Sequence, residues 1–239
     1  MKYLGGKSKT SKFIINEIEK YRFHDDYFVD VFGGGMNVID KVSGKRIAND
    51  NNYCLIEMWK AVQKGWEPPE IICEYMYNDI KNNKKIYPPY LVSFVGFASS
   101  FGGKWFGGYA RGKNSKNKER NYALESRNSI LKQRENLKDV KFICKNFWEL
   151  KIPKNSIIYC DPPYQGTTKY KDEFDHEFFW KWVRNIHNQG GKIFVSEYNA
   201  PDDFKCIWEK ETNSSIANQS KDSERKRIEK LFVHENFNF

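Results

Sequence analysis

The tetrapeptide Asp161-Pro162-Pro163-Tyr164 combines residue types that could hold and activate a planar amine. It follows the apolar stretch 157–160, which predicts a buried strand, and ligands of open parallel sheets bind beyond the carboxyl ends of the strands. Two prolines fix φ and donate no N–H, so they form a rigid turn whose carbonyls can accept hydrogen bonds. These acceptors and a tyrosine ring suit a flat group with an exocyclic NH2. A plain Pro-Pro turn is the alternative interpretation.

A second candidate site is the glycine turn Phe32-Gly33-Gly34-Gly35, which follows a predicted strand over 27–32. Glycines let a backbone approach a ligand closely, and neither G-x-G-x-x-G nor G-K-[ST] occurs at this turn, which argues against a phosphate loop there. Asp50 follows the next predicted strand, about 20 residues beyond the start of the glycine strand. A carboxylate there can accept both ribose hydroxyls of an adenosine-containing cofactor. A tight turn and a helix N-cap are the respective alternatives.

The segment 104–120 is rich in positive charge and in aromatic rings. Trp105, Phe106 and Tyr109 lie among glycines. The cationic side chains, set against Glu119 alone, are Lys104, Arg111, Lys113, Lys116, Lys118 and Arg120. Cations on a flexible loop suit phosphates and aromatic rings suit bases, although a solvated surface loop is the alternative. A second basic cluster over 221–230 also holds acids, including Glu229, and is interpreted as a solvated face.

The apolar pattern predicts the elements that must position these residues. Helices are predicted over 10–21, 37–42, 55–62, 124–137 and 178–186, and strands over 27–32, 46–49, 140–144, 157–160, 192–195, 204–208 and 228–233. This alternation is typical of a parallel sheet covered by helices. It is interrupted over 66–122, where two Pro-Pro pairs and the Gly-aromatic run lie. The last two strands predict a closing antiparallel hairpin.

The composition limits the partners and the compartment. The 239-residue chain has 40 Lys and Arg against 31 Asp and Glu, and its formal net charge of +9 suits nucleic acid, an anionic membrane or acidic proteins. No stretch approaches about 18 apolar residues and the first residues lack an apolar signal region, so we expect neither a membrane span nor secretion. Scattered cysteines and histidines predict reduced thiols in a cytoplasmic protein and no metal site.

Taken together, the motifs resemble those of the Dam-like DNA adenine methyltransferases. The shared motifs are Lys2–Lys7, Asp30–Gly35, Asn49–Asn52, the Gly-aromatic run and Asp161–Tyr164, in that order and over nearly the whole chain. The resemblance implies an α/β, Rossmann-like methyltransferase fold with a mainly parallel sheet, a C-terminal antiparallel hairpin and a small insertion. It also implies a catalytic domain formed by 1–65 and 123–239, and a target-recognition, DNA-binding insertion over 66–122.

The resemblance carries roles over to particular residues. It implies catalytic roles for Asp161, Pro162 and Tyr164. The implied cofactor-binding residues are Tyr3, Lys7, Phe32, Gly34, Asp50, Asn146, Phe147 and Asp161. The implied DNA-binding residues are Lys104, Trp105, Tyr109, Arg111 and Lys113. The chain departs from the family pattern at Met36, where a second glycine is usual, and at Asn146, which replaces an acid.

We therefore expect a site-specific enzyme that transfers a methyl group from S-adenosyl-L-methionine to the exocyclic amino group of adenine in double-stranded DNA, after base flipping. Asp161 and the Pro162 carbonyl would accept the two N–H bonds, and Tyr164 would stack on the base. We expect a monomer in the bacterial cytoplasm, encoded by a host, phage or prophage and acting in restriction-modification, phage protection or regulation. The alternatives are methylation of RNA or of cytosine amino groups, and a DNA-binding protein with a decayed cofactor pocket, which Met36 and Asn146 motivate.

Overall fold

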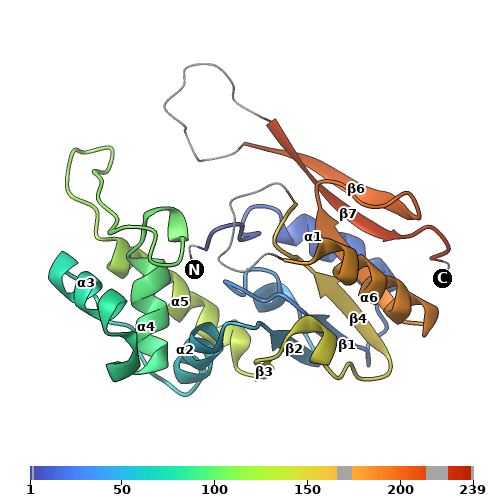
Figure 1. Cartoon of the computed structure of the whole chain (residues 1–239), viewed down its shortest axis with the longest axis horizontal. Helices are drawn as coiled ribbons and strands as arrows, with labels where there is room; N and C mark the ends of the chain where they lie inside the picture. The colour runs from blue at the N-terminus through green and yellow to red at the C-terminus, as the bar shows by residue number, and fades with distance from the viewer. Residues whose placement is uncertain (2, 166–173, 214–225, 238–239) are drawn as a thin grey trace.

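The computed structural model describes residues 1, 3–165, 174–213 and 226–237, and its centre is a seven-stranded sheet of order β3-β2-β1-β4-β5-β7-β6 (Figure 1). The strands are β1 (Tyr27–Asp30), β2 (Arg46–Asn49), β3 (Val140–Ile143), β4 (Ser156–Cys160), β5 (Lys192–Glu197), β6 (Phe204–Asn213) and β7 (Lys226–His234). The first five strands are parallel, and β7 is antiparallel to β5 and β6. The predicted fold class and closing hairpin are confirmed.

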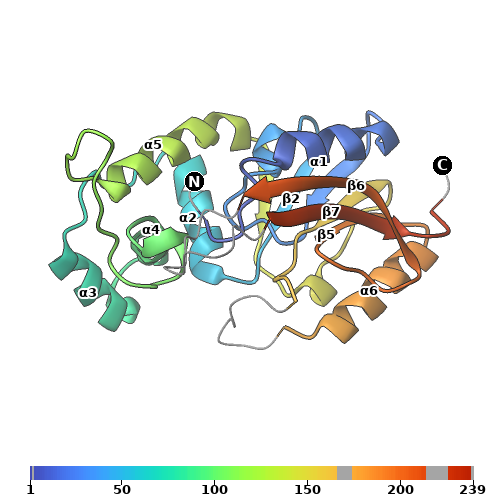
Figure 2. The same ribbon diagram turned by 90° about the horizontal axis from the view of Figure 1, so that it is seen from above.

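Helices cover both faces of this sheet. They are α1 (Ser11–Ile18), α2 (Tyr53–Gln63), α3 (Glu74–Asn82), α4 (Pro89–Ala98), α5 (Tyr122–Arg134) and α6 (His176–Asn188). Phe28 of β1 packs in one hydrophobic cluster with residues of α1 and α2, whereas Val29 packs in another with residues of α6. Because successive strand residues point to opposite faces, α1 and α6 lie on opposite sides of the sheet (Figure 2).

The strand order brings the two predicted chemical motifs together. The chain proceeds from β1 to β2 and β3 on one side, and β4 and β5 extend the sheet on the other side of β1. β1 and β4 are therefore neighbours, with Asp30 paired to Tyr159 near their carboxyl ends. The glycine turn follows β1 and Asp161 follows β4. Both motifs lie at the topological switch point, where ligands of open α/β sheets bind.

Residues 66–134, which contain α3, α4 and α5, form a helical lobe beside the sheet (Figure 1). The sequence pattern predicted neither α3 nor α4, only an interruption of the alternation there. Pro89 stands at the beginning of α4, where its missing N–H has no helical partner to lose. Seven of the ten residues of α4 are buried and the other three are half-buried, so the helix has no polar face. Without a polar face its sequence shows no helical period.

Two smaller differences concern short segments. The helix expected over 37–42 is reduced to a single 3-10 turn, Ile39–Lys41. Most of the polar connection between β6 and β7 lies outside the described residues. Among the residues described, no helix has both the length and the apolar character needed to cross a membrane.

Candidate active site at the carboxyl ends of the strands

Asp161, Lys7, Tyr164 and Glu229 form one network around the predicted catalytic turn. The Lys7 ammonium lies 2.8 Å from Oδ1 of Asp161 and 3.6 Å from Oε2 of Glu229. The Tyr164 hydroxyl donates to Oε2 of Glu229 over 2.8 Å. Lys7 also lies 4.5 Å from the centre of the Tyr164 ring. The structure thus brings three predicted site residues together and adds a fourth, Glu229, from β7.

Glu229 corrects one interpretation made from the sequence. It had been assigned to a solvated face, yet its side chain is only 13% exposed and it contacts the catalytic turn. Of the basic members of that cluster, Lys221 and Arg225 lie outside the described residues, and Lys230 of β7 is half-buried. A charged residue in a mixed segment gives no sequence signal of burial, so this contact could not have been predicted.

The charges in this network depend on one another. Burial raises the pKa of Asp161 to about 6, the neighbouring Lys7 lowers it, and Glu229 raises it. Burial opposes the charge of Lys7, but Asp161 and Glu229 outweigh that effect and raise the Lys7 pKa. Burial also raises the pKa of the Tyr164 hydroxyl, which stays a donor at neutral pH. At neutral pH, Asp161 is therefore an ionised acceptor held by a lysine cation.

Glu197 is a further acid at this edge, at the end of β5, and the sequence analysis missed it. Its side chain is 3% exposed. Its two oxygens accept the backbone N–H groups of Tyr198, over 2.8 Å, and of Gln165, over 3.3 Å. Burial raises its pKa to about 7. Because Gln165 directly follows the tetrapeptide, Glu197 fixes the end of the catalytic turn. The sequence signal that could have identified Glu197 is its place just beyond the predicted strand 192–195.

The glycine turn is built around Gly34. Its φ of +48° favours glycine, and a Cβ on Gly34 would lie 2.9 Å from the Tyr3 ring. Its N–H donates to Oδ2 of Asp50 over 3.0 Å, while Oδ1 of Asp50 accepts the N–H of Asn52 over 2.9 Å. Asn52, whose side chain accepts the Leu55 N–H, is the N-cap of α2. The N-cap alternative for Asp50 is therefore wrong, and Asp50 ties the turn to the end of β2.

The two departures from the family pattern are both accommodated. Met36 has a φ of +55° and its side chain is fully buried in the core, where a Cβ on Gly33 would lie 2.9 Å from its methyl group. Asn146 and Glu149 form a reciprocal capping box at the short turn Phe147–Glu149. The Asn146 amide donates to Glu149 over 2.9 Å. Met36 thus packs beneath the turn, and Asn146 has a local structural role.

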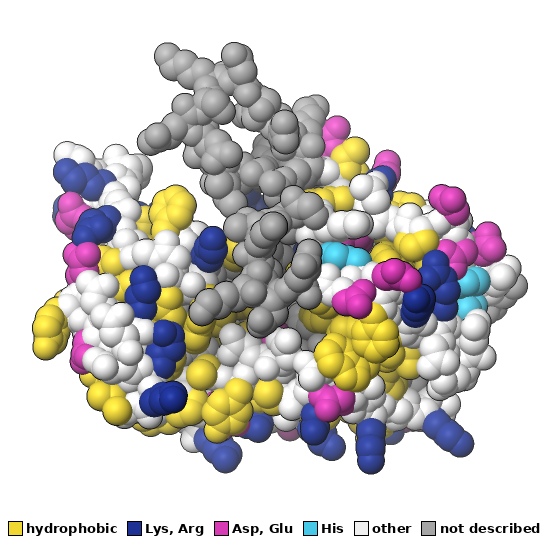
Figure 3. Space-filling view, in the orientation of Figure 1, with side chains coloured by type: hydrophobic (Ala, Val, Ile, Leu, Met, Phe, Trp, Pro, Cys, Tyr) yellow, Lys and Arg dark blue, Asp and Glu magenta, His cyan; other side chains and the backbone are white. Residues whose placement is uncertain are grey.

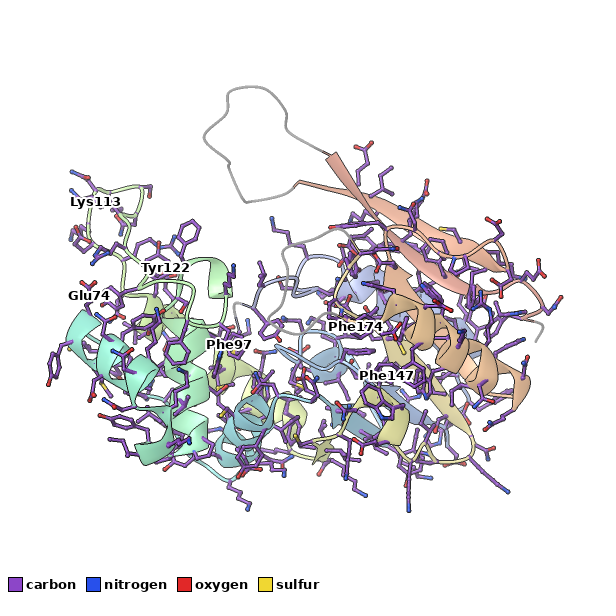
Figure 4. All side chains as sticks on the ribbon, viewed as in Figure 1. Glu74, Phe97, Lys113, Tyr122, Phe147 and Phe174 are labelled. Carbon is purple, nitrogen blue, oxygen red and sulfur yellow. The ribbon has the colours of Figure 1, made fainter. Side chains whose placement is uncertain are left out.

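Aromatic rings gather beside the glycine turn. The ring centres of Phe32 and Phe147 are 5.8 Å apart, and Phe174 lies 5.9 Å from Phe32 and 5.8 Å from Phe147. Phe147 and Phe174 lie together on the sheet side of the molecule in Figure 4. Phe147 is 6% exposed. Phe174 was not predicted, since it stands alone before α6 outside any repeating pattern.

Asp30, the last residue of β1, carries an unusual carboxyl group. The residue is 2% exposed, and Oδ1 has no hydrogen-bond partner among the described residues. Burial, followed by the charges of Asp161 and Asp50, raises its pKa well above the usual range. A buried polar atom without a partner is costly, so such atoms mark places where a ligand can bind.

In the helical lobe, the aromatic rings of the Gly-aromatic run are packed against α3 and α4. A Cβ on Gly96 of α4 would lie 2.7 Å from Trp105, whose ring centre is 4.8 Å from that of Phe97. The Tyr109 hydroxyl donates to the Ile72 carbonyl over 2.8 Å. These contacts give Trp105 and Tyr109 structural roles within the lobe.

The charged side chains of the same run point outward. Lys104 and Lys113 are exposed, and Lys113 lies on the loop that projects from the lobe in Figure 4. Arg111 is also exposed but pairs with Glu74 over 2.5 Å. Figure 3 shows several Lys and Arg side chains over the lobe. The lobe therefore exposes these cations, while Phe106 is buried and Trp105 and Tyr109 are half-buried.

The lobe is joined directly to the catalytic edge. The Leu4 N–H donates to the Gly103 carbonyl over 3.2 Å, and the ring centres of Tyr3 and Phe97 are 4.9 Å apart. The same N-terminal segment continues to Lys7, which pairs with Asp161. The predicted site residues thus form two groups, one on the lobe and one at the strand ends, connected by residues 3–7.

Comparisons with known proteins agree with this geometry. Residues 3–94 and 103–218 match the model of the D12 class N6 adenine-specific DNA methyltransferases. The Type II methyltransferase M.FokI of Planomicrobium okeanokoites is 28% identical over 199 residues, which make up 72% of this chain and 30% of that protein. The chain thus spans less than a third of that relative's length. Because the family model matches most of the sequence, the chain belongs to the D12 class N6 adenine-specific DNA methyltransferase family.

Proposed function

We propose that this chain transfers a methyl group from S-adenosyl-L-methionine to the exocyclic amino group of adenine in double-stranded DNA. The observation that carries the proposal is the pairing of Asp161 with Lys7 at the end of β4, one strand away from the glycine turn. The ionised Asp161 carboxylate and the Pro162 carbonyl then lie at the same edge of the sheet as the glycine turn. The proposed substrate site therefore adjoins the proposed cofactor site.

The residues around the glycine turn fit the cofactor. S-adenosylmethionine supplies an electrophilic methyl group on a sulfonium centre. Gly34 permits close approach, Asp50 can still accept ribose hydroxyls through remaining lone pairs, and Phe147 offers a ring for the adenine. Oδ1 of Asp30, which has no hydrogen-bond partner within the described part of the chain, offers an acceptor for a cationic or N–H group. Asn146 contributes by shaping the Phe147 turn.

The protein's own groups account for the activation of the amine. The amino group of adenine is enclosed in the duplex stack, so the base must be extruded into the site. Asp161 and the Pro162 carbonyl accept its two N–H bonds, which localises the nitrogen lone pair and directs it at the methyl group. Tyr164, whose ring also contacts Lys7 and Tyr198, stacks on the extruded base.

We assign DNA recognition to the insertion 66–122 and the chemistry to the domain formed by 1–65 and 123–239. Lys104 and Lys113 are exposed and are proposed to contact phosphates. Arg111 joins them by exchanging Glu74 for a phosphate. Trp105 and Tyr109 support the shape of the loop through their packing.

The decayed-pocket alternative loses its main motivation in this arrangement. Met36 is buried in the core, so its side chain does not fill the ligand side of the turn. Saturable binding of S-adenosylmethionine, measured by calorimetry, is the expected result for an intact pocket. A flat titration would favour the decayed-pocket alternative.

The experiment that tests the function is product identification. The purified chain is incubated with labelled S-adenosylmethionine and duplex DNA, and the digested nucleosides are separated. We expect N6-methyladenine, and a loss of about a thousandfold in Asp161→Ala because the charged acceptor is removed. Asp25→Ala is the matched control, since Asp25 is 88% exposed and precedes β1 at the opposite edge. Methylated cytosine, or methylation of RNA alone, would overturn the assignment.

A further inference from the structure

Glu229 reaches the catalytic turn from a part of the chain that the family match does not include. The match ends at residue 218, whereas Glu229 belongs to β7, Lys226–His234. Because β7 is antiparallel to β5, its beginning lies at the edge where β4 and β5 end, and Lys230 pairs with Glu197 there. Leu231 and Val233, on the same face as Glu229, pack in the cluster that includes α1. Lys7 precedes α1, so the strand delivers an acid to the lysine.

We propose that Glu229 is a positioning residue for methyl transfer, which fixes the tilt of the Tyr164 ring through its hydroxyl and holds Lys7 against Asp161. This inference rests on the proposed function. Glu229 touches neither the transferred methyl group nor the accepting nitrogen. It acts through Tyr164 and Lys7, which the proposed mechanism places beside the base.

The contacts support two separable effects. The first is steric, because the 2.8 Å hydrogen bond from Tyr164 fixes one end of a ring whose face lies 4.5 Å from Lys7. The second is electrostatic, because Lys7 is shared between Asp161 at 2.8 Å and Glu229 at 3.6 Å. Oε2 of Glu229 makes both contacts, so a single oxygen links the ring to the ion pair.

The steric effect is tested by kinetics with Glu229→Ala, Glu229→Gln and Tyr164→Phe. Glu229→Ala should lower kcat about tenfold to a hundredfold through misplacement of the ring, with KM for S-adenosylmethionine unchanged. Glu229→Gln retains an acceptor for the hydroxyl and should restore most of kcat. Glu229→Ala combined with Tyr164→Phe should cost little more than either change alone. The matched control is Glu209→Gln, on β6, where the acid is exposed.

The electrostatic effect is tested without turnover, by carbon-13 NMR titration of the Asp161 carboxyl in the free protein. The groups that face Asp161 or act on its charge are Lys7, Asp30, Tyr159, Cys160, Tyr164, Glu197 and Glu229. Glu229 raises the Asp161 pKa, so Glu229→Gln should lower that pKa. The acidic limb of the pH profile of kcat should also move to lower pH. A purely structural role for Glu229 would leave both the Asp161 titration and the acidic limb of the kcat profile unchanged.

The outcomes separate the inference from the proposed function. Wild-type kcat in Glu229→Ala, fully multiplicative losses in the double variant, or an unchanged Asp161 titration would each overturn the inference while adenine methylation by the wild type still stands. If the wild type methylates no adenine, the proposed function fails, and the NMR titration still decides whether Glu229 acts on Asp161.

Discussion

The catalytic edge and the helical lobe use the same kinds of residues in opposite ways. At the edge, the charges are buried and paired with one another, as with Lys7, Asp161 and Glu229. On the lobe, Lys104 and Lys113 are exposed to solvent, while Phe106 of the same run is buried and Trp105 is half-buried against Phe97. Buried charges interact strongly and shift one another's pKa values, whereas exposed charges are screened by solvent.

Under the proposed function, the edge serves the chemistry and the lobe serves recognition. A network of buried charges sets the protonation state of one carboxyl group. Methyl transfer to an amine needs such a defined acceptor. Exposed cations on a projecting loop provide a diffuse attraction, which suits a polyanion of any sequence. Substitutions at the edge should therefore change turnover and its pH dependence. Substitutions on the lobe should change DNA affinity and its salt dependence.

The largest effect is expected for Lys7→Met at the edge. Lys7 lowers the Asp161 pKa, so its removal raises that pKa above about 6 and leaves less ionised carboxylate at neutral pH. We expect kcat to fall about a hundredfold at pH 7 and the acidic limb of the profile to move to higher pH. Lys45→Met is the control, since Lys45 is 53% exposed and precedes β2. A loss that is the same at every pH would contradict this role.

Glu197→Gln tests whether ionisation of Glu197 lowers the free energy of unfolding as the pH rises. Burial raises the Glu197 pKa from 4.5 to about 7, so the folded state binds more protons than the unfolded state in that window. Its contribution to stability is present below about pH 4.5 and is lost as pH rises to 7. Glutamine cannot ionise, so up to about 3 kcal/mol of this loss should disappear.

Urea unfolding at several pH values measures this difference. Glutamine gives up one of the two acceptor oxygens, which lowers stability at every pH, so the readout is the change with pH between wild type and variant. Parallel curves across pH 4.5 to 7 would show that Glu197 does not titrate in this window.

A smaller effect is expected for Lys104→Ala with Lys113→Ala on the lobe. DNA affinity should fall about tenfold, and the slope of log affinity against log salt should fall by about 1 for each lysine. At saturating DNA, kcat should stay near the wild-type value because the edge is untouched. Fluorescence anisotropy over a salt series gives both quantities. An unchanged salt slope would remove these lysines from the DNA surface.

Tyr109→Phe should give the smallest effect. The change removes the hydrogen bond to the Ile72 carbonyl, so the free energy of unfolding should fall by about 1 kcal/mol. DNA affinity should not change, because the hydroxyl is used within the lobe. Thermal unfolding and anisotropy together check this result. A large drop in DNA affinity at unchanged stability would return Tyr109 to the DNA surface.

Sequence reasoning worked well where one pattern determined one element. β2 was predicted with its observed bounds, and the Asp161 and Gly34 turns were expected at strand ends, where the structure has them. It worked poorly in the lobe. The Pro-Pro pairs indicated breaks, although Pro89 begins α4, and the buried α4 shows no helical period. The base contacts expected of the aromatic residues among glycines stay a prediction, and Trp105 also packs on Gly96.

The sequence by itself determined the mainly parallel sheet, the order of the motifs and the place of the Asp161 turn directly after a strand, because local spacing and turn chemistry act within a few residues. The tertiary structure alone decided that Glu229 and Glu197 reach that turn, that Asp30 is buried with one oxygen that no described residue hydrogen-bonds, and that Asp50 holds Gly34 instead of capping a helix. These outcomes depend on strand order and on burial. Strand order and burial bring together residues that are far apart in the chain, and no short pattern encodes them.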